Sequence, residues 1–194
     1  MARSGRGNSS VLLMNSLTLT YVVSLTALAT VLKLRSFEVP YPPAPFLKYD
    51  ISGIPLALIG FISLKYTPIS LMVYFVLHLL MGADPIGMAM KCVAEASTFT
   101  PLALIRRKAD SKKTSILAVS CAVISRILVM AAMNYAITPY WLLWARWAKT
   151  LEDAYAKTLA LMPHIAVFNA TLALIVAPLS LLIYGVLKRA GFLR

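Results

Sequence analysis

The sequence predicts an all-α membrane protein, a bundle of six transmembrane helices with both termini in the cytoplasm. Hydrophobic residues make up 60% of the 194-residue chain and charged residues only 13%, and the mean hydropathy is +0.78. Soluble domains are less apolar and carry more charge. The apolar residues fall into six runs, and the basic residues gather at the ends of these runs, as in polytopic membrane proteins. We therefore treat residues 1–194 as a single polytopic transmembrane domain.

The first three apolar segments are one long run and two short ones. The first, 11–34, follows two arginines, but it is longer than the apolar core of a cleavable signal peptide. We therefore expect it to be a helix that spans the bilayer. The second and third, 51–64 and 68–81, lie near the lower length limit for spanning and are separated by only three residues. They predict a tight helical hairpin.

The last three apolar segments are long, and each predicts a spanning helix. They cover 85–105, 115–138 and 161–187. A basic loop at 106–113 separates the first two, and an amphipathic stretch at 140–158 separates the last two.

The segment at 35–50 predicts an external lid. Its prolines disfavour helix and favour an extended, stiff path; they are Pro40, Pro42, Pro43 and Pro45. Asp50 and Ser52 follow at the head of the next apolar run, where either side chain can accept hydrogen bonds from the first free backbone N–H groups of a helix. The lid would hold four side chains at the membrane surface: Phe46, Lys48, Tyr49 and Asp50.

Lysine and arginine counts predict the orientation. With six spanning segments, eleven basic residues fall on the side of the two termini and six fall on the side of the lid. Positive loops are retained in the cytoplasm. The termini are therefore expected on the cytoplasmic side of the cell membrane, and the lid on the outer side.

Composition and missing motifs exclude several functions. The net charge is +12, but the charges cluster at the ends of apolar segments instead of forming a basic face, so we expect no nucleic-acid partner. Cys92 and Cys121 both lie inside apolar runs, which argues against a disulfide framework or a metal site. No phosphate-binding loop, zinc-protease motif or serine-hydrolase motif is present. We expect no enzyme activity, no cofactor and no metal.

Ionisable and amide side chains inside the predicted helices point to a binding site. Such groups are costly in hydrocarbon unless they are paired or wetted. Glu95 and Arg126 fall at similar depth and could pair, either as a structural ion pair or as part of a ligand site; both readings stay open. Polar residues from four segments and the lid gather in the outer half and predict a pocket that opens outward: Asp50, His78, Lys91, Glu95, Asn134, His164 and Asn169. An isolated histidine in such a place more often serves helix packing.

The first helix carries a stripe of small residues that predicts a close helix contact. The stripe consists of Ser16, Thr20 and Ser24 at four-residue spacing, followed by Ala27 and Ala29. The contact could be internal packing or a partner subunit.

Three stretches together resemble a known family. They are PFLKYDISGIPLALIGF at 45–61, SRILVMAAMNYAITP at 125–139 and MPHIAVFNATLALIVAPLSLLIYGVLKR at 162–189. In order and spacing they are similar to the substrate-binding (S) subunit of energy-coupling factor (ECF) vitamin transporters, in the riboflavin-specific branch. The resemblance runs from about residue 16 to 189. The chain departs from the family pattern at Gly53, where an acid is usual, at Lys91, where asparagine is common, and at Leu172, where the riboflavin branch tends to have lysine.

The resemblance implies six helices with cytoplasmic termini, an outward-facing vitamin pocket closed by the first external loop, and no ATPase on this chain. The implied partners are a transmembrane coupling subunit and two ATPase subunits, besides membrane lipid. Riboflavin or a related flavin would be the transported ligand, not a cofactor.

In this interpretation the expected ligand-binding residues divide by role. Asn134 and Asn169 would hydrogen-bond the edge of the ring system, and Phe46 and Tyr49 would cover it. The charged members would contact polar tails: Lys48, Asp50 and Lys91, with Glu95 beneath them. Two alternatives remain, an S subunit for another vitamin or small molecule, and a self-sufficient secondary transporter that uses Glu95 as a proton site.

Overall fold

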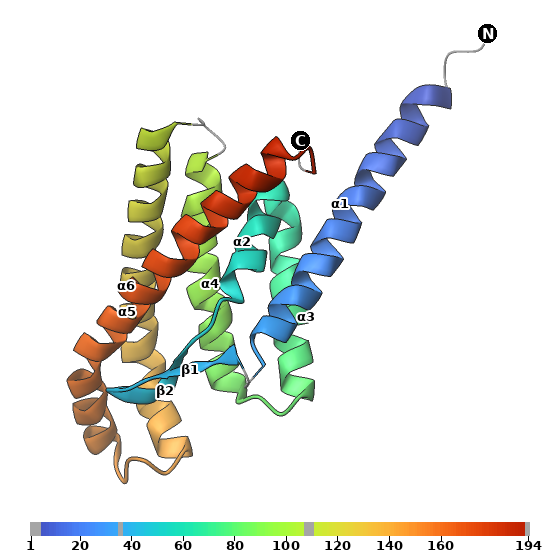
Figure 1. Ribbon diagram of the computed structural model, residues 1–194. Coiled ribbons are helices and arrows are strands. Elements are labelled where there is room, and N and C mark those ends of the chain that lie inside the picture. The colour runs from blue at the N-terminus through green and yellow to red at the C-terminus, as the bar shows by residue number, and fades with distance from the viewer. Residues whose placement is uncertain (1–4, 35–36, 107–110, 193–194) are drawn as a thin grey trace.

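The computed structural model describes residues 5–34, 37–106 and 111–192, with side chains from Ser16 onward. These residues form a helical bundle with one small β-hairpin (Figure 1). The helices are α1 (Gly5–Leu32), α2 (Gly53–Ile62), the short 3-10 helix η2 (Leu64–Tyr66), α3 (Thr67–Leu80), α4 (Pro85–Arg106), α5 (Lys112–Trp144) and α6 (Leu151–Arg189). The strands are β1 (Val39–Tyr41) and β2 (Ala44–Tyr49).

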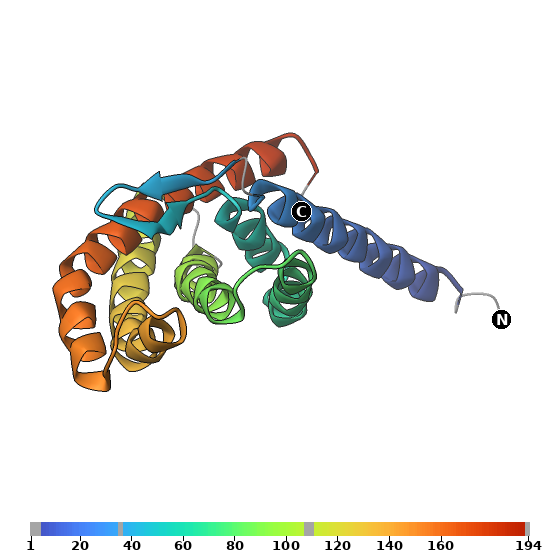
Figure 2. The same cartoon turned by 90° about the horizontal axis from the view of Figure 1, so that it is seen from below.

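The helices pack in an arrangement that puts α2 at the centre. α1 packs on α2 and α3, α4 packs on α2 and α5, and α6 packs on α5 and returns to α2. Nine of the ten residues of α2 are buried. The first half of α1 leans away from the other helices (Figures 1 and 2). The sequence predicted a spanning helix over 51–64; at about 1.5 Å per residue, α2 is only about half as long as a bilayer is thick.

The proline-rich segment is extended, as predicted, but it also pairs with itself. β1 and β2 run antiparallel, with Val39 opposite Tyr49 and Pro40 opposite Lys48. Prolines suit an edge strand and a turn, where no N–H donor is needed. The hairpin lies across α6 when the molecule is seen from below (Figure 2). We call this the hairpin end of the bundle, and the end with the C-terminus the opposite end (Figure 1).

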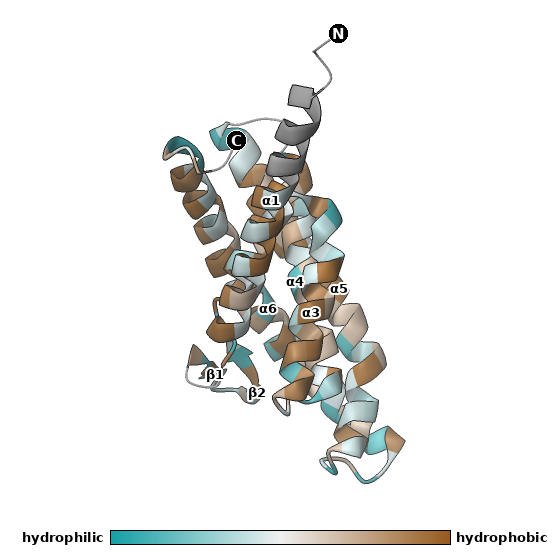
Figure 3. Cartoon of the chain, turned by 90° about the vertical axis from the view of Figure 1, so that its right-hand side faces the viewer, coloured by the Kyte–Doolittle hydropathy of each residue, from teal (hydrophilic) through white to brown (hydrophobic). Residues whose placement is uncertain are grey.

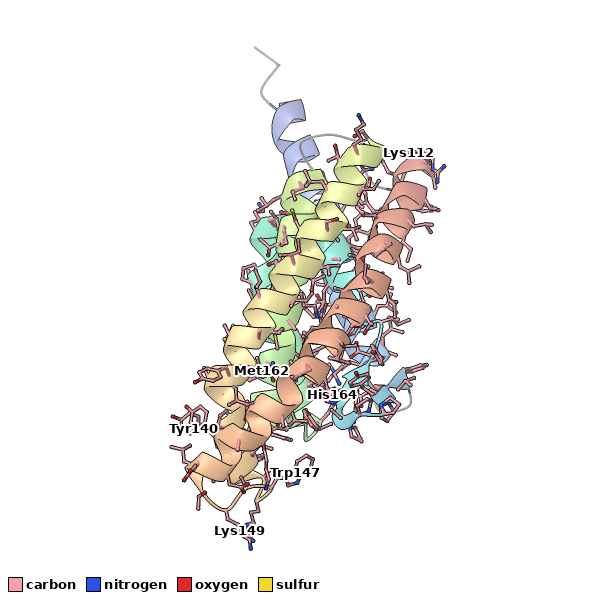
Figure 4. All side chains as sticks on the ribbon, turned by 90° about the vertical axis from the view of Figure 1, so that its left-hand side faces the viewer. Lys112, Tyr140, Trp147, Lys149, Met162 and His164 are labelled. Carbon is pink, nitrogen blue, oxygen red and sulfur yellow. The ribbon has the colours of Figure 1, made fainter. Side chains whose placement is uncertain are left out.

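The last two helices are longer than the sequence predicted. α5 continues past Thr138 through Pro139 to Trp144, and α6 begins at Leu151, capped by the Thr150 side chain, which accepts from the Asp153 N–H at 3.2 Å. Most of the stretch at 140–158 is therefore helix. Figure 4 places Tyr140, Trp147 and Lys149 at the hairpin end and Lys112 at the opposite end.

The outer faces of the bundle are apolar. In the part of the chain that the structure describes, α5 and α6 are each long and apolar enough to cross a membrane, and less than a third of their most apolar stretch is buried. Shorter apolar helices lie at Ser16–Leu32, Gly53–Ile62 and Leu64–Leu80. Large apolar side chains are exposed on α1, α3, α5 and α6, for example Leu17, Met72, Leu128 and Leu182, and brown, hydrophobic residues recur along the helices in Figure 3. Exposed apolar surface of this extent is rare on soluble monomers and normal against lipid.

Candidate functional site

A cavity of about 790 Å³ lies at the hairpin end of the bundle. Pockets of about 300 to 1,000 Å³ hold most small-molecule ligands. The end of α1, the hairpin and helices α3, α4, α5 and α6 all contribute to its wall. This is the polar pocket that the sequence analysis expected beneath the lid.

Most of the predicted ligand-binding residues lie in this wall: Phe46, Lys48, Asp50, Lys91, Asn134 and Asn169. Tyr49 does not. Its hydroxyl lies 2.7 Å from Thr171 Oγ1, and its ring packs 4.9 Å from the ring of Phe168. Tyr49 therefore fixes the hairpin to α6 and is not among the residues that line the cavity; its contact with a ligand ring stays a prediction.

Glu95 is not among the residues that line the cavity, but it contacts two residues that do, Lys91 and Arg126. Its side chain is 1% exposed. The Lys91 ammonium stands between two carboxylates, 2.9 Å from Asp50 Oδ2 and 2.8 Å from Glu95 Oε1. Lys91 is thus held on both sides by negative charge.

Arg126 completes a buried charge network across three helices. Its Nη1 lies 3.4 Å from Glu95 Oε1 and donates to Thr98 Oγ1 at 3.0 Å, and its Nε donates to Asn169 Oδ1 at 3.0 Å. The predicted Glu95–Arg126 pair is therefore present. Two carboxylates, Asp50 and Glu95, balance two cations, Lys91 and Arg126. We call these four residues the charge network.

The β2–α2 junction fixes Asp50 in this network. Asp50 Oδ1 accepts the Ser52 backbone N–H at 2.9 Å and the Ser52 hydroxyl, which itself lies 2.9 Å from the Tyr74 hydroxyl. Burial alone would raise the pKa of Asp50, but Lys91 and the Ser52 hydroxyl hold it below its usual range. Asp50 is ionised at neutral pH. The Ser52 side chain itself makes no cap hydrogen bond to α2, contrary to one of the two capping predictions.

The two asparagines each keep hydrogen-bonding capacity. Asn134 Nδ2 donates to Met130 O at 2.7 Å, and its Oδ1 accepts from Thr138 at 2.9 Å. Asn169 Nδ2 donates to Ile165 O at 2.9 Å, and its Oδ1 accepts from Arg126. An amide has two N–H donors and two acceptor lone pairs. Among the described residues, each asparagine therefore retains one donor and one acceptor for a ligand.

A second ionic contact ties the hairpin to α1 at the cavity mouth. Glu38 accepts from the Lys48 ammonium at 2.6 Å and from the Lys33 ammonium. Burial alone would raise the pKa of Glu38, but the two lysines lower it. The carboxylate links the end of α1 to β2.

Aromatic side chains flank the cavity on the α5 side. The ring of Phe46 lies 5.5 Å from that of Trp141, which in turn lies 5.3 Å from Trp147. Trp141 Nε1 donates to Asp84 Oδ2 at 3.0 Å. Trp141 was not predicted from the sequence, because the apolar run that predicted this helix ends at Thr138. Trp141 nevertheless continues the helical face of Arg126 and Asn134.

The two predicted histidines differ in position: one lines the cavity and the other does not. His78 is buried and lines the cavity. His164 is exposed and lies outside the cavity wall, with its ring 6.4 Å from that of Tyr41 (Figure 4).

The small-residue stripe on α1 is one residue shorter than predicted. The four exposed members share one face of the helix: Ser16, Thr20, Ser24 and Ala27. Ala29 is fully buried in the core of the bundle. At about 100° per residue it points about 140° away from Ser16, so it belongs to the internal contact and not to the exposed face.

One of three comparisons with known proteins bears on the fold. No protein-family model matches the chain, and no curated protein matches its sequence. The structure is similar to a solved structure of the S component of a bacterial ECF transporter, with a TM-score of 0.68 and 23% identity over 90% of this chain and 96% of that one. The chain therefore shares the all-helical fold of an S component, as the motifs in its sequence led us to expect.

Proposed function

We propose that this protein is the membrane-embedded substrate-binding subunit of an ECF-type transporter and captures riboflavin or a related flavin from outside the cell. The cavity beneath the hairpin carries this proposal. Its wall offers two amides that each retain a donor and an acceptor, next to charges that already balance one another.

The chemistry of the wall favours a flat, uncharged heterocycle. Amide groups complement the alternating donors and acceptors at the edge of a flavin ring. Phe46, Trp141 and Phe168 offer aromatic faces, and methionines offer adaptable apolar contact. An anionic ligand held by Lys91 is less favoured, because Asp50 and Glu95 already neutralise that ammonium.

The distribution of basic residues supports the proposed orientation. The hairpin end would face outward, and both termini would lie in the cytoplasm, with six helical segments in the membrane, of which α2 is too short to cross it alone. Basic residues such as Lys112, Lys188 and Arg189 lie near helix ends at the opposite end of the bundle. Lipid would cover the apolar outer faces of the helices.

Transport would need separate partners. No phosphate-binding loop is present in the sequence, so ATP hydrolysis is assigned to two ATPase subunits. A transmembrane coupling subunit would pack against the exposed small residues of α1, where close helix approach is sterically allowed.

The alternative with Glu95 as the proton site of a secondary transporter is less favoured. The carboxylate lies 2.8 Å from Lys91 and 3.4 Å from Arg126, so it already takes part in two ion pairs of the charge network.

The absorbance spectrum of the purified protein tests the proposal. We expect protein purified gently from cells grown with riboflavin to be yellow, and ATPase subunits to co-purify when all subunits are expressed together. A colourless protein that takes up solute by itself in vesicles under a proton gradient would contradict the proposal.

A further inference from the structure

His78 on α3 is a buried histidine in the cavity wall that the proposed ring contacts do not use. It is 5% exposed and lines the cavity together with Asn134 and Asn169. α3 packs chiefly against α1 and α4, whereas the two asparagines belong to α5 and α6. His78 therefore stands on the side of the cavity away from the amides.

The hydrogen bond at one ring nitrogen determines what the other can do. His78 Nδ1 lies 2.7 Å from Tyr74 O. A backbone carbonyl can only accept, so Nδ1 carries the hydrogen. In the neutral imidazole this leaves a lone pair on Nε2, which is an acceptor.

The Nε2 atom is buried and has no hydrogen-bond donor as a partner among the described residues. The Thr30 backbone carbonyl on α1 also lies near the ring, but a carbonyl can only accept, so it does not supply that donor. A buried acceptor without a donor is costly, and such atoms in native proteins usually meet a ligand or an ordered water. Because the residue lines the cavity, a bound molecule can supply the missing donor.

The imidazole is also held in place. Its ring lies 4.5 Å from the ring of Tyr74. The Tyr74 hydroxyl lies 2.9 Å from Ser52 Oγ, which binds Asp50 of the charge network. A ring fixed in this way loses little conformational freedom when a ligand binds, which is the condition for a selective contact.

We infer that His78 Nε2 accepts a hydrogen bond from a hydroxyl group on the ligand's tail, opposite the amides that contact the ring, and so determines specificity for a hydroxylated ligand. This inference rests on the proposed function, since the tail in question is the ribityl chain of a flavin. The amides would hydrogen-bond the edge of the ring, and His78 would hydrogen-bond a hydroxyl group of the tail.

The test compares riboflavin with lumiflavin, which has the same ring but a methyl group in place of the ribityl chain. Each flavin is titrated at pH 8, where histidine is largely neutral, into the wild type, His78→Phe and His78→Gln. His164→Phe is the matched control, because His164 is exposed and lies outside the cavity wall. Thermal unfolding of each variant checks that it is folded.

We expect His78→Phe to weaken riboflavin binding roughly tenfold to a hundredfold and lumiflavin binding by less than about twofold. His78→Gln should recover part of the loss, because a glutamine oxygen can reach the position of Nε2. His164→Phe should change neither affinity. The preference for riboflavin over lumiflavin would then depend on the Nε2 atom of His78.

Three outcomes would overturn the inference. If His78→Phe weakens both flavins equally, the residue supports the fold or the ring site and does not read the tail. If it weakens neither, Nε2 meets a water in the bound state. If the wild type binds neither flavin, the proposed function fails and this inference fails with it; in the first two cases riboflavin binding by the wild type still stands.

Discussion

The two halves of the bundle bury different kinds of side chain. The hairpin half buries the charge network, two asparagines and a histidine around a cavity. The opposite half buries apolar side chains from α2 and α4, among them Ile59, Phe61, Phe99 and Leu102.

This difference separates recognition from assembly. Burying a polar group costs free energy unless the group has a hydrogen-bond partner. Unused donors and acceptors in the cavity wall therefore indicate that a ligand binds there. The exposed small residues of α1 allow a helix of another subunit to pack closely against the bundle. Variants on the exposed face of α1 should therefore leave ligand binding intact, and variants in the cavity wall should leave subunit assembly intact.

The largest expected effect is on transport. Ser24→Trp places a bulky side chain on the exposed face of α1, away from the cavity, and should abolish uptake in cells with all subunits while riboflavin affinity is unchanged. Leu128→Trp, on the exposed apolar face of α5, is the matched control and should transport normally. Equal loss of uptake and binding in Ser24→Trp would show that the face serves internal packing.

The next effect is on stability. Arg126→Met removes a cation that contacts Glu95, Thr98 and Asn169 at 1% exposure. Breaking a buried pair by removing one partner costs about 3 to 5 kcal/mol. We expect a clear fall in the thermal unfolding temperature in detergent. An unchanged temperature would mean that the network is not a structural element of the hairpin half.

A smaller effect is expected at Gly53, on the border between the halves. A Cβ added there would collide with Glu95 Oε2 and lie 3.0 Å from Val176 Cγ1. Gly53→Ala should therefore cost about 1 to 3 kcal/mol of stability through overpacking. At Gly60 the nearest atom would be at 3.6 Å, so Gly60→Ala should be neutral or stabilising. Similar unfolding temperatures for the two variants would contradict this.

The smallest effect is at the cavity mouth. Glu38→Gln weakens the link from Lys33 and Lys48, and partly exposed ion pairs contribute about 0.2 to 1 kcal/mol each. We expect riboflavin dissociation in stopped flow to accelerate by about two- to fivefold. Because the pKa of Glu38 is lowered, the link is complete above the usual glutamate range and is lost only as the pH falls through the lower value. If the dissociation rate of riboflavin changes between pH 6 and 8 in the wild type but not in Glu38→Gln, the lowered pKa of Glu38 is contradicted.

The sequence predicted the helical architecture and several of the polar side chains in the cavity wall because both follow from local patterns. Apolar runs located the helices, and polar residues at one depth located Lys91, Asn134 and Asn169. The Glu95–Arg126 pair could be inferred from depth alone, since unpaired charges are rarely tolerated there.

What the sequence could not predict depends on three-dimensional contacts. The continuation of α5 past Pro139 relies on packing against α6, which outweighs the hydrogen bond that proline removes. The place of Tyr49 on α6 depends on the pairing of β1 with β2. The burial of Ala29 could have been found by helical periodicity, because its angular position differs from that of the other small residues.

Titration of the purified protein with riboflavin, followed by quenching of flavin fluorescence, tests the central claim that the hairpin half is a flavin site. We expect saturable quenching by the wild type at micromolar protein or below. Asn134→Ala and Asn169→Ala should each weaken binding roughly tenfold to a hundredfold, for a loss of about 1 to 3 kcal/mol, and His164→Ala should weaken it much less. No quenching by folded wild-type protein would contradict the account and leave only the fold.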